Sequence, residues 1–130
     1  MANQFPHDLK YSDSHEYVRV EGSEATMGVT NFAAEQLGDV VFVELPSVGQ
    51  RVEAGESVGS IESVKAVSEL YAMVSGDVVA INNEVDSSPE LVNEDPYGDG
   101  WLVKIRMSDP QELDRAMTAD TYSSLVSGQE

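Results

Sequence analysis

The chain contains no cysteine among its 130 residues. This absence excludes disulfide bonds, zinc–thiolate sites and cysteine nucleophiles, so any thiol chemistry would have to come from an attached group. Long apolar runs are missing too, because no segment approaches the roughly 18 residues of a membrane-spanning helix. The N-terminal segment, MANQFPHDLKYSD, has neither an apolar core nor an arginine-rich amphipathic pattern. We therefore expect neither a signal peptide nor a transit peptide.

Basic residues are scarce. Seven lysines and arginines stand against 24 aspartates and glutamates, which gives a formal net charge of −17. Such a charge repels phosphate backbones and anionic lipids, so we expect no nucleic-acid partner and no membrane partner. The charge favours solubility, and it also suits recognition by basic docking patches on partner enzymes.

Short strand-like runs dominate the sequence, and no low-complexity linker divides it. With 41% apolar residues, we expect one domain over residues 1–130 with a substantial core. Alternating and β-branched runs predict strands at 17–20, 25–29, 40–45, 51–53, 57–64, 67–73, 77–81 and 101–107. The predicted fold class is mainly β, a flattened β-barrel or sandwich with short peripheral helices near both ends.

Start and stop signals predict four short helices. Thr30 can cap a helix that Gly38 ends, Asp109 precedes a proline at a helix start, and Thr118 can cap the last helix. These helices are expected at 31–37, 89–92, 110–117 and 118–127, the last two forming a C-terminal helical segment over about 110–127.

The remaining segments carry weaker signals. Residues 1–16 are polar and are expected to begin as a loose arm. The near-continuous apolarity of residues 40–45 predicts a strand buried on both faces. Residues 82–84 are expected to form a turn, and residues 93–100 are too rich in turn formers for regular structure.

The sequence holds no convincing catalytic set. It lacks a GxSxG elbow and a Walker loop, and the acidic loop at 94–99 does not have the spacing of a calcium hand. His7 and His15 could form a metal pair, but isolated surface histidines are far commoner. We therefore expect no catalytic residue and no metal site.

Lys65 is one of only three lysines, and it lies between two strand-like runs at a predicted hairpin turn. Gly49 precedes it by 16 residues and Gly76 follows it by 11, each at the edge of a similar β-branched run. Two similar half-sheets that meet at an exposed lysine are typical of a swinging-arm carrier with a lipoyl or biotinyl group. The ordinary alternative is a solvated surface lysine.

The residues beside Lys65 narrow the choice of group. Biotin carriers usually place methionine on both sides of the lysine, whereas Val64 and Ala66 flank it here, which favours lipoate. The chain resembles the glycine cleavage H-protein family along nearly its whole length, although Tyr17 stands where that family usually has tryptophan. The matching segments are HEYV (15–18), GVTNFAAEQLGDVVFVELPSVG (28–49), ESVKAVSELYAMVSGDVV (62–79) and NEDPYGDGWLVKI (93–105).

The resemblance implies a lipoyl-domain fold, the barrel-sandwich hybrid, with its core at about 25–107. It implies a non-enzymatic carrier with lipoate joined to Lys65 as an amide by lipoate-attaching enzymes. The carrier would take the aminomethyl group of glycine from a pyridoxal-phosphate glycine decarboxylase (P protein) to a tetrahydrofolate-dependent aminomethyltransferase (T protein). A dihydrolipoyl dehydrogenase (L protein) would then reoxidise it.

By match to family positions, Glu16, Ser14 and Glu69 are the candidates for a cleft that shelters the loaded arm. In such an acidic chain they could equally be ordinary surface residues. Two other functions stay open: a relay or donor in protein lipoylation, which would use the same Lys65, and an unmodified structural domain. The resemblance implies the cytoplasm of a bacterium, or the mitochondrial matrix for a processed organellar form.

Overall fold

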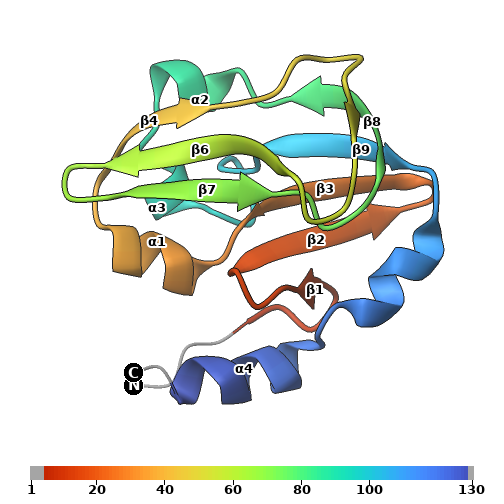
Figure 1. Ribbon diagram of the computed structural model, residues 1–130. Helices are drawn as coiled ribbons and strands as arrows, with labels where there is room; N and C mark the ends of the chain where they lie inside the picture. The colour runs from red at the N-terminus through yellow and green to blue at the C-terminus, as the bar shows by residue number, and fades with distance from the viewer. Residues whose placement is uncertain (1–4, 129–130) are drawn as a thin grey trace.

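The fold consists of two antiparallel sheets with short helices at their margins, as the computed structural model of residues 5–128 shows (Figure 1). A six-stranded sheet has the order β1-β2-β3-β9-β8-β5, and a three-stranded sheet has the order β4-β6-β7. The strands are β1 (Lys10–Tyr11), β2 (Glu16–Glu21), β3 (Glu24–Val29), β4 (Val40–Glu44), β5 (Arg51–Val52), β6 (Ser57–Ser63), β7 (Val67–Tyr71), β8 (Gly76–Ile81) and β9 (Val103–Met107). The helices are α1 (Asn31–Leu37), α2 (Glu84–Ser87), α3 (Leu91–Glu94), the 3₁₀ helix η1 (Pro110–Arg115) and α4 (Ala119–Ser127).

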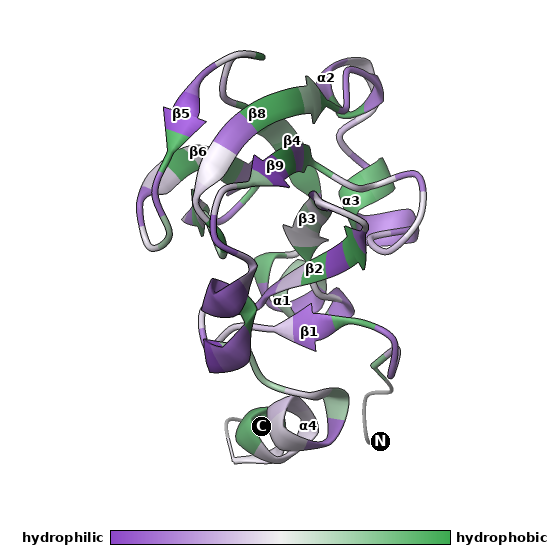
Figure 2. Ribbon diagram, turned by 90° about the vertical axis from the view of Figure 1, so that its right-hand side faces the viewer, coloured by the Kyte–Doolittle hydropathy of each residue, from purple (hydrophilic) through white to green (hydrophobic). Residues whose placement is uncertain are grey.

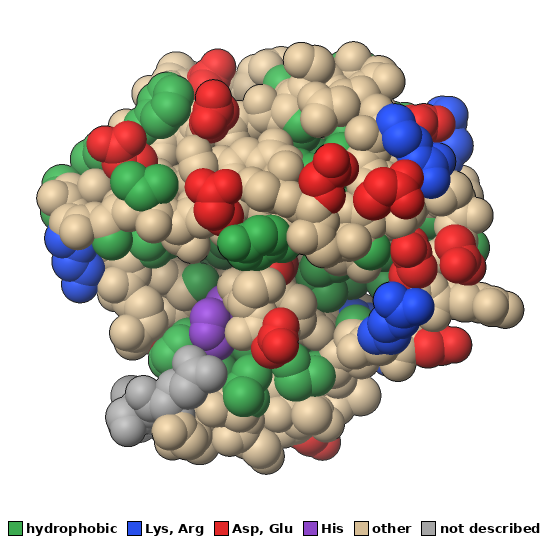
Figure 3. Space-filling model, in the orientation of Figure 1, with side chains coloured by type: hydrophobic (Ala, Val, Ile, Leu, Met, Phe, Trp, Pro, Cys, Tyr) green, Lys and Arg blue, Asp and Glu red, His purple; other side chains and the backbone are tan. Residues whose placement is uncertain are grey.

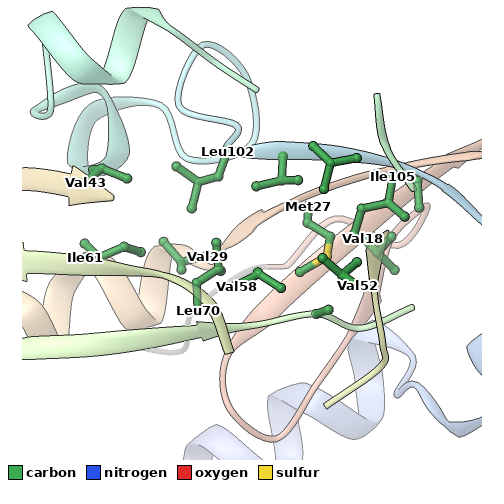
Figure 4. Close-up of a cluster of buried hydrophobic side chains, with 14 of the residues drawn as sticks. Val18, Met27, Val29, Val43, Val52, Val58, Ile61, Leu70, Leu102 and Ile105 are labelled. Atoms are coloured by element: carbon green, nitrogen blue, oxygen red, sulfur yellow. The ribbon is translucent and has the colours of Figure 1, made fainter. Parts of the chain in front are cut away.

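The main hydrophobic core lies between the inner faces of the two sheets (Figure 4). The strands contribute inward side chains at alternate positions, and complete burial of such a side chain contributes about 1.5–3 kcal/mol. The two sheets do not close into a barrel but face each other as a sandwich, with short helices at the margins. The predicted mainly β fold class is confirmed, in its sandwich form. The core includes Val18, Met27, Val29 and Ile105 from one sheet and Val43, Ile61 and Leu70 from the other.

The helix caps predicted at Thr30, Asp109 and Thr118 are present. The Thr30 hydroxyl accepts a hydrogen bond from the backbone N–H of Ala33 at 3.2 Å, and Gly38 ends α1 with a φ of 78°. Asp109 caps η1 and Thr118 caps α4 in the same manner, through backbone N–H groups two and three residues on. These side chains satisfy backbone donors that have no partner within the helix.

The prediction of a loose arm at residues 1–16 is wrong for residues 5–16; residues 1–4 lie outside the described part. Phe5 and Tyr11 are buried, β1 pairs with β2, and α4 lies beneath them (Figure 2). Tyr11 stacks on Tyr122 of α4 with ring centroids 4.9 Å apart. The N-terminal segment is thus ordered by a second small core that it shares with the C-terminal helix.

The prediction that residues 40–45 are buried on both faces is also wrong. Val41 and Phe42 in β4 are 48% and 51% exposed, whereas Val43 is buried. The β4–β6 register shifts between Val40 and Phe42, and β4 is an edge strand whose Val43 packs in the core while Phe42 faces away from it. An apolar run is therefore not a reliable sign of burial when its strand lies at the edge of a sheet.

Several element boundaries also differ from the sequence prediction. Residues 84–87 form the one-turn helix α2, where a turn was expected at 82–84. Helix α3 begins at Leu91, and strand β9 begins at Val103. The segment after Asp109 is a 3₁₀ helix that ends at Arg115, so Met117 lies outside it and pairs with Tyr11. None of the helices described over residues 5–128 is long and apolar enough to cross a membrane.

Candidate functional site

Lys65 lies in the turn between β6 and β7, and backbone hydrogen bonds hold that turn. The Ser63 N–H donates to the Ala66 carbonyl at 2.8 Å, and the Ser63 hydroxyl oxygen accepts from the N–H groups of Ala66 and Lys65 at 3.1 and 3.3 Å. The Val64 N–H donates to the carbonyl of Asp39, next to α1. The peptide around the lysine is therefore fixed to the rest of the fold.

The Lys65 side chain itself is exposed, as are its neighbours Val64 and Val67, at 71% and 64%. The turn passes close to Gly38, where a built Cβ would lie 3.4 Å from Lys65 Cε. The cavities of about 610, 340 and 160 Å³ described below are not lined by Lys65. The amine is thus open to an enzyme from outside, while its backbone is held in place.

The two glycines of the predicted frame lie on neighbouring segments that pair with each other. β5 pairs with β8, so that Val52 lies opposite Gly76, and the Gly49 N–H donates to the Val78 carbonyl at 2.7 Å. A Cβ at Gly76 would collide with the carbonyl oxygen of Arg106 on β9. Glycine is needed there because two backbones approach closely, and this contact closes the segment that carries Lys65.

A groove runs beside β7, between that strand and the loop that precedes β2 (Figure 3). It contains a larger cavity of about 610 Å³, bounded also by η1, and a smaller one of about 160 Å³, bounded also by α1. Ser14 and Glu16 line both cavities. Ser68 and Glu69, near Lys65 in sequence, line the smaller cavity, which therefore lies on the side toward the lysine turn.

Glu16 is the buried carboxylate of this groove, with only 1% of its surface exposed. Its Oε1 accepts hydrogen bonds from the hydroxyls of Ser12 and Ser14 at 2.6 and 2.5 Å, and its Oε2 accepts from the Tyr71 N–H at 3.0 Å. Burial raises the pKa of Glu16, while these three hydrogen bonds favour the charged form and oppose the rise.

Two of these partners were not predicted from the sequence. Ser12 lies at the start of the turn that precedes β2, where the His15 N–H donates to the Ser12 carbonyl at 3.1 Å, and this turn brings the Ser12 hydroxyl back to Glu16. No sequence signal points to Tyr71, since its contribution is a backbone N–H at the end of β7.

Glu69 lies apart from the Glu16 cluster. It is exposed, and its Oε1 accepts a hydrogen bond from the Ser57 hydroxyl at 2.5 Å on the outer face of the three-stranded sheet. The structure therefore brings Glu16 and Ser14 together. Glu69 also lines the smaller cavity, but its carboxylate is hydrogen-bonded to Ser57.

The two histidines are separate. His7 is exposed, and the Nδ1 of His15 lies 2.7 Å from the Tyr122 hydroxyl, which also hydrogen-bonds the Thr30 hydroxyl at 2.8 Å. In the described part of the chain, no group of three or more histidines and carboxylates has the geometry of a metal site. His15 links α4 to the loop of Glu16.

Fold and site together define a class: a two-sheet β protein that presents one lysine on an open, fixed hairpin turn beside a groove with a buried carboxylate. A family model described as "Glycine cleavage H-protein" matches residues 9–129. The chain belongs to the glycine cleavage H-protein family.

Curated relatives support this assignment. The chain is 57% identical to the glycine cleavage system H protein of Synechococcus sp. (strain JA-3-3Ab), over 98% of this chain and 99% of that protein. It is 53% identical to the glycine cleavage system H protein of Bacillus cereus (strain AH187), over 93% of this chain and 95% of that protein. The crystal structure of a glycine cleavage system H protein from Mycobacterium marinum superposes with a TM-score of 0.87 at 37% identity, covering 95% of this chain and 99% of that one.

Proposed function

We propose that this protein is the lipoyl carrier of a glycine cleavage system, with lipoate joined by an amide bond to Lys65. The observation that carries the proposal is the exposed Lys65 side chain on a turn whose backbone is fixed. When bound, the lipoyl group would supply a dithiolane that accepts the aminomethyl group of glycine. The protein is then a carrier and not an enzyme, because placement and recognition are its own contributions.

The groove fits such a group in length and in chemistry. A lipoyl-lysine chain has about 12 bonds from Cα to sulfur and extends about 14 Å. The arm starts at Lys65, two residues before β7, and the four residue steps of β7 span about 13 Å. The arm would therefore extend along most of β7 toward Tyr71, whose N–H bonds Glu16. The apolar wall there includes Ala72, Met73 and Met117, which suits an alkyl chain.

Glu16 and Ser14 are the residues that we propose to hold the cationic cargo. A carboxylate has about four lone-pair sites, and Glu16 uses three of them for Ser12, Ser14 and Tyr71. One site is left for an ammonium group, which would lower the pKa that burial raises. Glu69 is a second candidate at the mouth of the smaller cavity, and the groove would keep water from the cargo.

The partners that we propose are the glycine decarboxylase (P protein), the aminomethyltransferase (T protein), the dihydrolipoyl dehydrogenase (L protein) and a lipoate-attaching enzyme. The location that we propose is the bacterial cytoplasm, where these enzymes would act together. The matched curated relatives named above are bacterial.

Peptide mass spectrometry of the native protein and glycine–bicarbonate exchange with the P protein test the proposal. We expect lipoate on Lys65 and exchange that depends on it. Exchange with an unmodified Lys65 would contradict the proposal. Lipoate on Lys65 without exchange would instead favour a relay in protein lipoylation.

A further inference from the structure

The outer face of the three-stranded sheet is an unpartnered surface beside Lys65. Its inward residues fill the core, whereas its outward residues form two cross-strand rows. The row nearer to Lys65 is Phe42, Glu62 and Val67, and the next is Glu44, Ser60 and Glu69. We call these six residues the outer face; five of them are exposed and Ser60 is partly exposed.

The outer face exposes large apolar side chains that contribute to no core. Phe42 is 51% exposed and Val67 is 64% exposed, and Val64 in the lysine turn is 71% exposed. Isolated apolar side chains at a surface are normal, but an aromatic residue among valines next to a functional residue is typical of an interface centre.

The charge of the outer face is entirely negative. Glu44, Glu62 and Glu69 lie on it, and the one ion pair among residues 5–128 joins Arg51 and Glu53 elsewhere. A hollow of about 340 Å³ lies between Glu44 and Glu69, and no lysine or arginine lines it. Figure 3 shows acidic side chains over this face and basic ones at its margins. Five of the seven basic residues lie on strands of the six-stranded sheet: Lys10, Arg19, Arg51, Lys104 and Arg106.

We propose that the outer face docks the enzyme that forms the amide bond on Lys65. This inference rests on the proposed lipoyl attachment. The complementary surface of that enzyme carries an arginine or lysine for the hollow between Glu44 and Glu69, and an apolar pocket for Phe42. Matching charge of this kind speeds the encounter and fixes the orientation of two proteins.

The short reach of the unmodified lysine favours this occupant over the enzymes that use the loaded arm. A lysine side chain extends only about 6 Å from Cα, so the enzyme has to contact the residues around the turn. In the reaction, the neutral Lys65 Nζ attacks the carbonyl of an adenylate-activated lipoate. The C–O bond to the phosphate breaks, AMP leaves, and the proton of Nζ passes to solvent.

The test compares acylation of the unmodified full chain by a lipoate–protein ligase supplied with lipoate and ATP, followed by intact-protein mass spectrometry. We expect kcat/KM to fall about tenfold in Glu44→Lys and about fivefold in Phe42→Ala. Glu21→Lys, at an exposed residue of β2, is the control with the same change of charge, and Val20→Ala is a smaller apolar truncation on the same strand; both keep the wild-type rate.

Added salt should lower kcat/KM more steeply for the wild type than for Glu44→Lys, and thermal unfolding should show that every variant is folded. If the wild type is acylated on Lys65 and the outer-face variants match it, the docking proposal is wrong. The same holds if only exchange with the P protein is slowed, because the face would then serve that partner. A wild type that is not acylated on Lys65 would instead overturn the proposed function itself.

Discussion

Glu16 gives the most specific prediction about the groove, because all three of its hydrogen-bond partners are identified. In Glu16→Ala, the hydroxyls of Ser12 and Ser14 and the N–H of Tyr71 lose their acceptor. Each lost bond in a buried site costs about 1 kcal/mol, and an unpaired buried donor costs about 1–3 kcal/mol. Ser14 is exposed and can turn to water. We therefore expect the free energy of unfolding to fall by about 2–4 kcal/mol.

Glu16→Gln separates the structural role of this residue from its charge. The amide oxygen can accept from the Tyr71 N–H while the amide NH₂ donates to the serine hydroxyl oxygens, so we expect a loss of about 1 kcal/mol or less. The charge-assisted bond to the cargo would be lost, and its worth of about 1.5–3 kcal/mol predicts a loaded arm that decays about 10- to 100-fold faster.

Urea unfolding at pH 7 measures the first effect, and the half-life of the loaded, lipoylated protein in buffer measures the second. A Glu16→Gln protein that is stable and keeps the wild-type half-life would refute the role of the carboxylate. A Glu16→Ala protein as stable as the wild type would refute the hydrogen-bond account itself.

Three further predictions concern stability. Burial raises the folded-state pKa of Glu16, so its contribution to the free energy of unfolding is complete below the unfolded pKa and is lost as pH rises through the folded pKa. In urea unfolding between about pH 4 and 7, the stability of Glu16→Gln relative to the wild type should therefore increase with pH, and a constant difference would contradict this. Tyr17→Phe leaves the Pro96 carbonyl without its 2.6 Å bond and should cost about 1–2 kcal/mol in urea, so an unchanged midpoint would exclude the bond. Gly76→Ala forces the backbones of β8 and β9 apart at Arg106 and should lower the thermal midpoint by more than 5 °C, so a smaller shift would show that the close contact is not needed.

The parts of the fold that follow from local rules were predictable. The Thr30 and Thr118 caps each depend on a hydroxyl and a backbone N–H three residues apart, so the sequence alone contains both partners. The hairpin of Lys65 was predictable from local sequence as well, because two strand-like runs flank the lysine at short distance. The fold class followed from the number of such runs.

The parts that depend on distant partners were not predictable. The N-terminal segment is ordered because Tyr11 stacks on Tyr122, and a separation of 111 residues leaves no local pattern. Tyr71 bonds Glu16 through its backbone, which no choice of side chain reveals. Strand β4 appeared fully buried because composition does not distinguish a core residue from an exposed Phe42.

The residues of the candidate site also differ in how far the sequence predicts them. Lys65 was predicted from its frame and its neighbours, and Glu16 and Ser14 from the family resemblance. Ser12 completes that cluster from the same loop, while Glu69 bonds Ser57 on the outer face of the sheet. The direction in which Glu69 points depends on the β6–β7 register, which the sequence does not specify.

The most direct test of the carrier function is glycine–bicarbonate exchange with Lys65→Arg, supported by the mass of the 62–79 peptide. The wild type should carry lipoate on Lys65 and support exchange. The variant should carry none and support none, while its thermal midpoint stays within about 1–2 °C because an exposed lysine adds little stability. Exchange that persists in a folded Lys65→Arg protein would contradict the account.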